Sequence, residues 1–197
     1  MNFSLKYFVL FFYLFFSNLS FAEDNLASFL VRGYQPNTLP FVGAKDADYT
    51  IVEFFDYRCG YCSKQASDFS ELLVENKNIK IIYLEFPIFG GISEIASLIA
   101  LKVWKQNPNL YFEIHNSFMN LGPSMKKKNL IEVLNKNGFD GKKIYDSVKG
   151  EKNNKIILQN KALAKSLNLR GTPASVVNDT IIPGYVKLSN LRKMVSQ

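Results

Sequence analysis

The sequence predicts an α/β fold in which a strand–helix–strand half and a strand–strand–helix half are separated by a long helical insertion. An apolar, β-branched and aromatic run at 51–55 gives way to a helical pattern from Cys62 onward, as at the start of a βαβ unit. A second apolar strand follows at 80–86. Short β-branched strands return only near the end of the chain, so we expect the insertion over about 88–170.

Residues 1–22 have the pattern of a secretory signal peptide. Lys6 precedes an apolar core at 7–16, and Ser20-Phe21-Ala22 forms a small-x-small cleavage site. The core is about ten residues long, whereas an uncleaved membrane anchor needs about 20. We therefore expect cleavage after about Ala22 and a periplasmic mature chain that forms a single domain over 23–197.

The formal net charge of the chain is +7, and loss of Lys6 with the signal peptide lowers it to +6. The lysines are scattered, and only Lys126-Lys127-Lys128 forms a block. Blocks of fewer than about five like charges carry little meaning, so we expect a solvated helix face here. An exported protein meets little nucleic acid, and we expect no nucleic-acid partner.

The first half of the fold begins with a connection over 23–48, in which we expect one short helix at 26–31 and one short edge strand. The helix that carries Cys62 should run to about Asn76. The strands on either side of this helix, at 51–55 and 80–86, should be parallel because a helix connects them.

Helix start and stop signals divide the insertion into five helices. In chain order they are one from Ser93 as N-cap to Gln106, one from Asn107-Pro108 to Gly122-Pro123, one over 126–137 stopped by Gly138, one from Asp140 as N-cap to Lys149, and the longest over 151–168. His115 and Trp104 are expected to be packing residues, since no metal or nucleophile partner is visible near the histidine.

The C-terminal half is predicted from two short β-branched strands at 174–177 and 180–182 and a closing helix at 188–196. Asn178-Asp179 lies between the strands, and these residue types tolerate the positive φ of a tight turn. We therefore expect an antiparallel hairpin.

Cys59 and Cys62 are the only cysteines of the chain and lie at the predicted strand-to-helix junction. A helix N-terminus presents unpaired N–H groups and a partial positive charge, which favour a thiolate, so Cys59 should be the reactive thiol. A C-x-x-C pair in an oxidising compartment indicates redox catalysis, with a static disulfide as an alternative. A closed zinc site needs about four ligands, whereas this chain adds only the distant His115. We expect no metal and no other cofactor.

Five motifs occur in order along the chain. They are Val52-Glu53-Phe54-Phe55-Asp56-Tyr57 before Cys59-Gly60-Tyr61-Cys62, Phe86-Pro87 with Ser93, Phe112-x-x-His115, Gly171-Thr172-Pro173-Ala174, and Pro183-Gly184. Together they resemble the DsbA-like, exported branch of the thioredoxin superfamily over most of the chain after the signal peptide. The resemblance implies a thioredoxin fold with a helical insertion between the βαβ half and the C-terminal ββα half. It also implies dithiol–disulfide exchange with secreted proteins.

The resemblance implies roles for residues around the cysteines. Pro173 matches the cis-proline that faces the active-site disulfide, and Thr172 would offer its backbone to an extended substrate. Gly60 and Tyr61, between the cysteines, would also contact the substrate. Glu53 matches the buried acid behind the second cysteine, where a raised pKa suits proton exchange with that thiol. The plainer alternatives are an ordinary turn proline and a structural glutamate.

The residues next to the cysteines depart from the DsbA pattern, which has Cys-Pro-His-Cys and a valine before the cis-proline. Gly60-Tyr61 and Thr172, within CGYC and GTPA, resemble instead the catalytic domain of the disulfide isomerase DsbC. That isomerase carries a separate N-terminal dimerisation domain, and residues 23–49 are too few to form one. We therefore expect a monomeric oxidase of broad specificity.

A disulfide isomerase or reductase is the alternative reading, followed by a soft-metal protein that binds copper through the two thiolates and by an inactive interaction protein. The expected partners are exported proteins bearing cysteines, together with a membrane or soluble redox partner that resets the active site.

Overall fold

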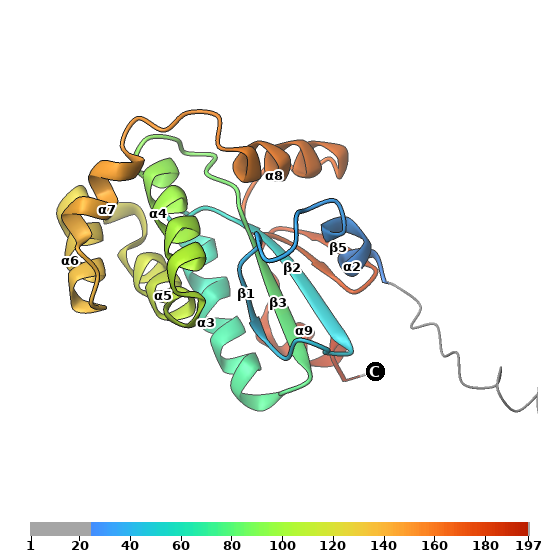
Figure 1. Ribbon diagram of the computed structural model, residues 1–197. Helices are drawn as coiled ribbons and strands as arrows, with labels where there is room; N and C mark the ends of the chain where they lie inside the picture. Colours follow the sequence, from blue (N-terminus) through green and yellow to red (C-terminus); the bar gives the residue numbers. More distant parts are fainter. Residues whose placement is uncertain (1–24, 197) are drawn as a thin grey trace, which may run out of the picture.

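The computed structural model describes residues 25–196, so the predicted signal peptide lies outside the described residues. Its centre is a five-stranded sheet in the order β1-β3-β2-β4-β5 (Figure 1). β2 and β3 are parallel, as predicted, and the other neighbours are antiparallel. The strands are β1 Phe41–Gly43, β2 Tyr49–Phe55, β3 Ile79–Glu85, β4 Ala174–Val177 and β5 Thr180–Pro183.

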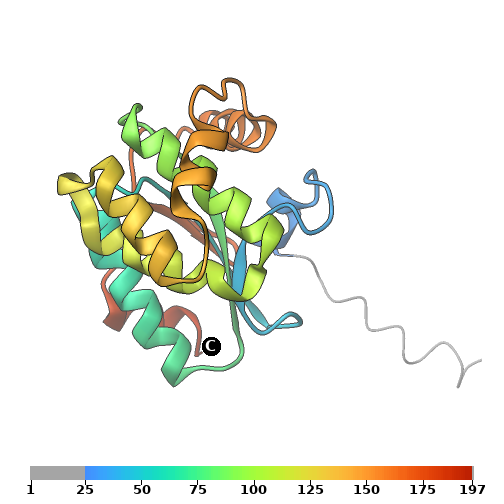
Figure 2. The same ribbon diagram turned by 60° about the vertical axis from the view of Figure 1, so that its left-hand side comes forward.

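Helices cover both faces of the sheet, and the four helices between residues 92 and 148 form a lobe at one end of it (Figures 1 and 2). α2 and the second half of α8 pack on one face, whereas α3, α4, α5 and α9 pack on the other. None of the helices within residues 25–196 is long and apolar enough to cross a membrane. The helices are α2 Leu26–Val31, α3 Gly60–Glu75, α4 Ile92–Gln106, α5 Tyr111–Leu121, α6 Lys127–Lys136, α7 Gly141–Val148, α8 Lys155–Ser166 and α9 Leu188–Met194.

Alternation along β2 divides the core into two clusters. Ile51 and Phe55 face the cluster formed with α3, α4 and α5, whereas Val52 and Phe54 face the cluster formed with α2 and α8. Successive side chains of a strand point to opposite faces of a sheet. Glu53 therefore lies on the α3 side, between two fully buried apolar residues.

The edge strand β1 confirms the short strand predicted within 23–48, and it ends at a glycine that its surroundings require. Gly43 has a φ of 96°. A side chain at this position would also collide with the backbone carbonyl of Ile79 on the neighbouring strand. Glycine alone tolerates both conditions.

The prediction that Ser93 caps the first insertion helix is wrong. α4 begins at Ile92, after Gly90 and Gly91 with positive φ, and no side chain caps it. The Ser93 hydroxyl instead donates a hydrogen bond to Asp56 Oδ1 at 2.7 Å. The serine therefore holds the loop that follows β2 and not the helix start.

The prediction of a longest helix over 151–168 is also wrong. Within the insertion, α8 has 12 residues and α4 has 15. The Asn154 side chain accepts hydrogen bonds from two backbone N–H groups of the first turn, so the helix starts only at Lys155. Asn107, by contrast, makes no side-chain cap. Pro108 starts a 3₁₀ turn that precedes α5.

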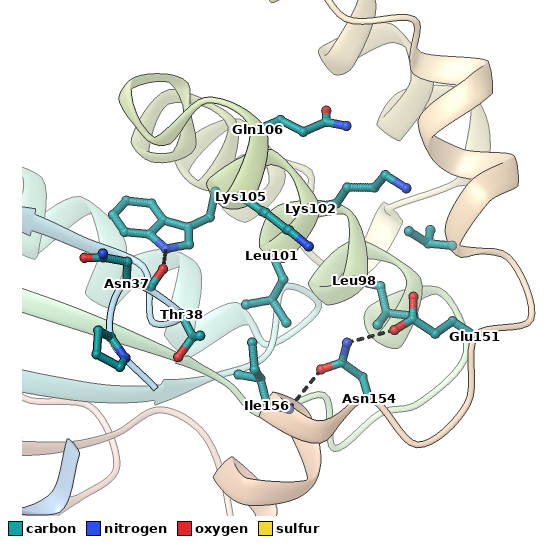
Figure 3. A pocket seen from close by; sticks show the side chains of 13 residues that line it. Asn37, Thr38, Leu98, Leu101, Lys102, Lys105, Gln106, Glu151, Asn154 and Ile156 are labelled. Atoms are coloured by element: carbon teal, nitrogen blue, oxygen red, sulfur yellow. Dashed lines mark hydrogen bonds between the residues drawn. The ribbon is translucent and has the colours of Figure 1, made fainter. Parts of the chain in front are cut away.

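A cavity of about 760 Å³ lies where α4 meets the N-terminal segment and the start of α8 (Figure 3). Leu98, Leu101 and Ile156 line it. Trp104 Nε1 donates a hydrogen bond to the carbonyl of Asn37 at 2.9 Å, so this tryptophan joins the lobe to the N-terminal segment. Neither cysteine lines this cavity.

Candidate functional site

Strand β2 delivers the two cysteines to the start of α3. Cys59 is the N-cap of this helix and has an extended backbone. The Cys62 backbone N–H donates a hydrogen bond to Cys59 Sγ at 3.4 Å, so the sulfur takes the position that a capping oxygen usually occupies. Both cysteines are free thiols. The predicted strand-to-helix position of the pair is confirmed.

Asp56 fixes the loop between β2 and Cys59. Its buried carboxylate accepts hydrogen bonds from the backbone N–H groups of Arg58 (2.8 Å) and Phe89 (3.0 Å) and from the Ser93 hydroxyl (2.7 Å). Its carbonyl accepts a further hydrogen bond from the Cys59 N–H. The cysteine loop is thereby tied to the loop before α4. This role of Asp56 was not predicted from the sequence, although a charged residue directly after a buried strand is a signal for it.

The two sulfurs differ in exposure. Cys62 has no exposed surface and Cys59 is 7% exposed. The second thiol is therefore shielded from solvent, and the first is less open than a freely exposed nucleophile. The reason is that the Cys59 thiol lies against the segment before β4, where it donates a hydrogen bond to the Thr172 carbonyl at 3.2 Å.

The two thiols also differ in acidity. Hydrogen bonding from the Cys62 thiol, the Thr172 side chain and backbone N–H groups of the helix start favours the thiolate and lowers the pKa of Cys59 from 9.0 to about 6, against the opposing effect of burial. Burial raises the pKa of Cys62, and the neighbouring Cys59 and Glu53 raise it further. At neutral pH Cys59 is therefore mostly a thiolate and Cys62 a thiol.

The segment before β4 carries the predicted cis-proline. The Thr172–Pro173 peptide bond is cis, and the Pro173 carbonyl accepts a hydrogen bond from the Gly184 N–H at 2.9 Å. A cavity of about 370 Å³ is lined by residues 168–174 together with Pro183 and Gly184. Thr172, which lines this cavity, also carries the carbonyl that accepts the hydrogen bond from Cys59.

Tyr61 stands at the rim of the site. It is 66% exposed, and its ring lies 6.2 Å from that of Tyr185, measured between centroids. Tyr185 is held in turn by a 2.6 Å hydrogen bond from its hydroxyl to Asp68 Oδ2. Gly60 is also exposed, and nothing lies within 4 Å of a Cβ placed there. The residues between the cysteines therefore face outward into solvent.

Glu53 is fully buried on the same face of the sheet as α3, and neither of its carboxylate oxygens has a hydrogen-bond partner among the described residues. Burial raises the pKa of Glu53 well above its usual range, and charge on Cys59 and Glu85 raises it further. Charge on Glu53 in turn raises the pKa of Cys62, so the buried carboxyl and the shielded thiol act on each other electrostatically.

Residues 25–196 contain no group of three or more histidine, cysteine, aspartate or glutamate side chains that could hold a metal ion. His115 is fully buried and touches Tyr57, as expected of a hydrogen-bonded packing residue. What the site provides is a stabilised thiolate, a shielded thiol and a neutral acid, with the cis-proline segment in contact with the thiolate sulfur. That set suits exchange between a dithiol and a disulfide.

The model of the DSBA-like thioredoxin domain family matches residues 50–196. Disulfide bond formation protein D of Bacillus subtilis (strain 168) is 23% identical over 168 residues, which cover 80% of this chain and 76% of that protein.

Solved structures agree with the family match. A thioredoxin-like oxidoreductase from Silicibacter pomeroyi DSS-3 has a TM-score of 0.71 and 31% identity, covering 82% of this chain and 91% of that one. The thiol-disulfide exchange protein alpha-DsbA2 of Wolbachia pipientis has a TM-score of 0.74 and 26% identity, covering 86% and 94%. The catalytic domain of Proteus mirabilis ScsC has a TM-score of 0.73 and 28% identity, covering 82% and 89%.

These matches confirm the predicted thioredoxin fold with its helical insertion. The family match spans both halves of the sheet from β2 onward, including both cysteines and the cis-proline. The chain therefore belongs to the DSBA-like thioredoxin domain family and is a thiol–disulfide oxidoreductase.

Proposed function

We propose that this oxidoreductase acts in the periplasm, where it introduces or exchanges disulfides in exported proteins through the Cys59–Cys62 pair. The observation that carries the proposal is the unequal pair of thiols. The low pKa of Cys59 suits both a nucleophile and a leaving group, and the buried Cys62 can react only within the protein. The signal-peptide pattern at 1–22 supports export.

In the oxidising direction a substrate thiolate attacks Cys59 Sγ of the Cys59–Cys62 disulfide. A mixed disulfide forms with Cys59, the Cys59–Cys62 bond breaks, and Cys62 leaves with the electron pair. A second substrate thiolate then attacks the substrate sulfur, and Cys59 leaves as a thiolate. Two electrons pass from the substrate to the enzyme, and a membrane or soluble redox partner removes them.

Glu53 supplies the proton that the departing Cys62 needs. A thiolate in a fully buried position is unfavourable, and the raised pKa of Glu53 keeps a proton available on its carboxyl. In the reverse direction the same carboxylate accepts the proton, so that Cys62 can attack the mixed disulfide.

Thr172 and Pro173 position the substrate in this proposal. They line a cavity next to β4, and the Thr172 carbonyl contacts Cys59 Sγ, so an extended segment could lie along this cavity and reach the sulfur with its cysteine. Gly60 and Tyr61 would meet the substrate from the helix side because both are exposed.

Isomerisation is a second candidate direction, because Gly60-Tyr61 and Thr172 resemble the residues of the isomerase DsbC. A glutathione redox titration combined with refolding of scrambled ribonuclease separates the two. Strong refolding activity would assign isomerisation, whereas efficient oxidation of reduced ribonuclease with weak refolding would assign oxidation.

The test of the proposal is to trap substrates on full-length Cys62→Ser in the periplasm, with Cys59→Ser as the matched control. Cys62→Ser keeps the nucleophile but cannot resolve the mixed disulfide, so adducts with cysteine-bearing exported proteins should appear on non-reducing gels. Cys59→Ser should give none. Equal adducts from both variants would contradict the assignment, and an N-terminus other than Glu23 on the periplasmic protein would contradict the cleavage site.

A further inference from the structure

Tyr185 lies against the face of α3 that starts between the two cysteines. Tyr61, Lys64 and Asp68 share this face because they are spaced three and four residues apart along the helix. All three contact Tyr185. Its ring centroid lies 6.2 Å from that of Tyr61, with 31° between the ring planes, and 4.6 Å from Lys64 Nζ. Its hydroxyl donates a hydrogen bond to Asp68 Oδ2 at 2.6 Å.

The backbone on both sides of Tyr185 is fixed as well. The Gly184 N–H donates a hydrogen bond to the carbonyl of Pro173 at 2.9 Å, which ties this segment to the cis-proline. The Val186 N–H donates a hydrogen bond to Oε1 of the buried Gln65 on α3, also at 2.9 Å. Tyr185 is therefore held between the cis-proline segment and the helix that carries the cysteines, and its ring is in place before any substrate arrives.

Tyr61 extends this aromatic surface to the reactive sulfur. Cys59 Sγ caps the first turn of α3 by accepting a hydrogen bond from the Cys62 N–H, and Tyr61 lies within that turn. The Tyr61 side chain is 66% exposed, next to the fixed ring of Tyr185. Single exposed apolar side chains are common on protein surfaces. Two neighbouring aromatic rings beside a reactive sulfur, however, form a surface that every partner of that sulfur meets.

The contacts of Tyr185 indicate which side chain fits this surface. Its hydroxyl is bonded to Asp68, so the ring and not the hydroxyl is offered to a ligand. Lys64 already lies over the ring, so a second cation would be repelled. Aromatic rings attract one another at centroid distances of about 4.5–7 Å by more than the apolar area they bury, and a ring that is already fixed loses little conformational entropy on binding. An aromatic side chain is therefore favoured over a cationic and over an aliphatic one.

We propose that Tyr61 and Tyr185 form an aromatic platform that selects substrates with an aromatic side chain next to the reacting cysteine. The proposal rests on the proposed function and names a substrate class for it. The chemistry is unchanged: a substrate thiolate forms a bond with Cys59 Sγ, Cys62 leaves with the electron pair, and a second substrate thiolate then releases Cys59. Consecutive residues of an extended chain are about 3.3–3.6 Å apart, so the neighbour of the substrate cysteine lies within reach of Tyr61.

The test is a competition between two dithiol peptides that carry phenylalanine or leucine on both sides of the first cysteine and are otherwise identical. The purified oxidised protein is mixed with both peptides, and mass spectrometry gives the ratio of their rates of oxidation. Glutathione disulfide alone gives the intrinsic ratio of the two peptides. Relative to this reference, wild type should prefer the phenylalanine peptide by about two- to tenfold, which corresponds to one aromatic contact. A change in the acidity of Cys59 or in the redox potential affects both peptides equally, so the ratio reports the platform.

Variants of the two tyrosines locate the preference. Tyr61→Leu and Tyr185→Leu each remove one ring but keep an apolar side chain, and each should move the ratio toward the glutathione reference. Tyr185→Phe keeps the ring and loses only the hydrogen bond to Asp68, so it should retain the preference. Phe29→Leu is the matched control, because Phe29 is an exposed aromatic residue on α2, which packs on the opposite face of the sheet. This variant should show the wild-type ratio.

A wild-type ratio equal to the glutathione reference would overturn the proposal, and so would an unchanged ratio in Tyr61→Leu or in Tyr185→Leu. A loss of preference in Tyr185→Phe as large as that in Tyr185→Leu would also overturn it, because the hydrogen bond to Asp68 and not the ring would then be responsible. Tyr61 is exposed, so Tyr61→Leu keeps the test decisive should Tyr185→Leu fail to fold. A folded wild type that oxidises neither peptide would instead reject the proposed function.

Discussion

The pKa of Cys59 should depend on the thiol of Cys62. Its lowering from 9.0 to about 6 corresponds to roughly 4 kcal/mol in favour of the thiolate. Hydrogen bonding from Cys62 is the largest cause, and a hydrogen bond to a charged group contributes about 1.5–3 kcal/mol. Cys62→Ala should therefore raise the pKa of Cys59 by about 1 to 2, to between roughly 7 and 8.

The assay is a thiolate absorbance titration of the reduced proteins. Cys62→Ala has one thiol, so its signal comes from Cys59 alone, and in wild type the raised pKa of Cys62 keeps that thiol silent. Tyr61→Phe is the matched control, because it keeps the backbone N–H that donates a hydrogen bond to the Cys59 sulfur. Its Cys59 should therefore titrate with the same pKa as in wild type. An unchanged pKa in Cys62→Ala would refute the reasoning, and so would a wild-type pKa near 9.0.

Three further predictions concern proton transfer, the cysteine loop and pH. Glu53→Gln removes the exchanging carboxyl, so stopped-flow closure of the Cys59–Cys62 disulfide from a mixed disulfide should slow by roughly 10²-fold, and an unchanged rate would exclude this role. Asp56→Asn places an amide N–H2 where the carboxylate accepts three hydrogen bonds, and it should lower the free energy of unfolding, measured in urea, by about 1–3 kcal/mol. Ser93→Ala, the control, loses only one of these hydrogen bonds and should lower the free energy of unfolding by less. The pKa of Cys59 is lower in the folded protein than in the unfolded chain. The free energy of unfolding of the reduced wild type, relative to that of Cys59→Ser, should therefore rise by about 1.4 kcal/mol per pH unit between about pH 6 and 9. A difference between the two proteins that does not change with pH would contradict this.

The elements that could be predicted from the sequence are those with a strong local signal. The run at 51–55 and the hairpin turn at Asn178, which has a φ of 48°, are as predicted. Asp140 caps α7 as predicted, because its side chain accepts the Lys143 N–H at 2.9 Å. In each case a few neighbouring residues determine the conformation.

Features that depend on contacts between distant residues were missed. Ser93 has the sequence of a helix cap, but its hydroxyl bonds Asp56, which lies 37 positions earlier in the chain. Glu85 reads as a polar residue at the end of an apolar strand, and only folding brings Tyr57 and Tyr111 to its carboxylate. The cysteines were found because C-x-x-C has a chemical meaning by itself, whereas a buried glutamate does not.

The central claim is that Cys59 and Cys62 form one two-electron redox pair in which Cys59 meets the substrate. The most direct test is to equilibrate the purified mature protein with defined ratios of reduced and oxidised glutathione and to map the products by mass spectrometry after acid quenching. We expect a two-electron transition to an internal Cys59–Cys62 disulfide, and in Cys62→Ser a glutathione adduct on Cys59 only. The absence of the internal disulfide at every ratio, or a glutathione adduct on Cys62 of Cys59→Ser as readily as on Cys59 of Cys62→Ser, would contradict the claim.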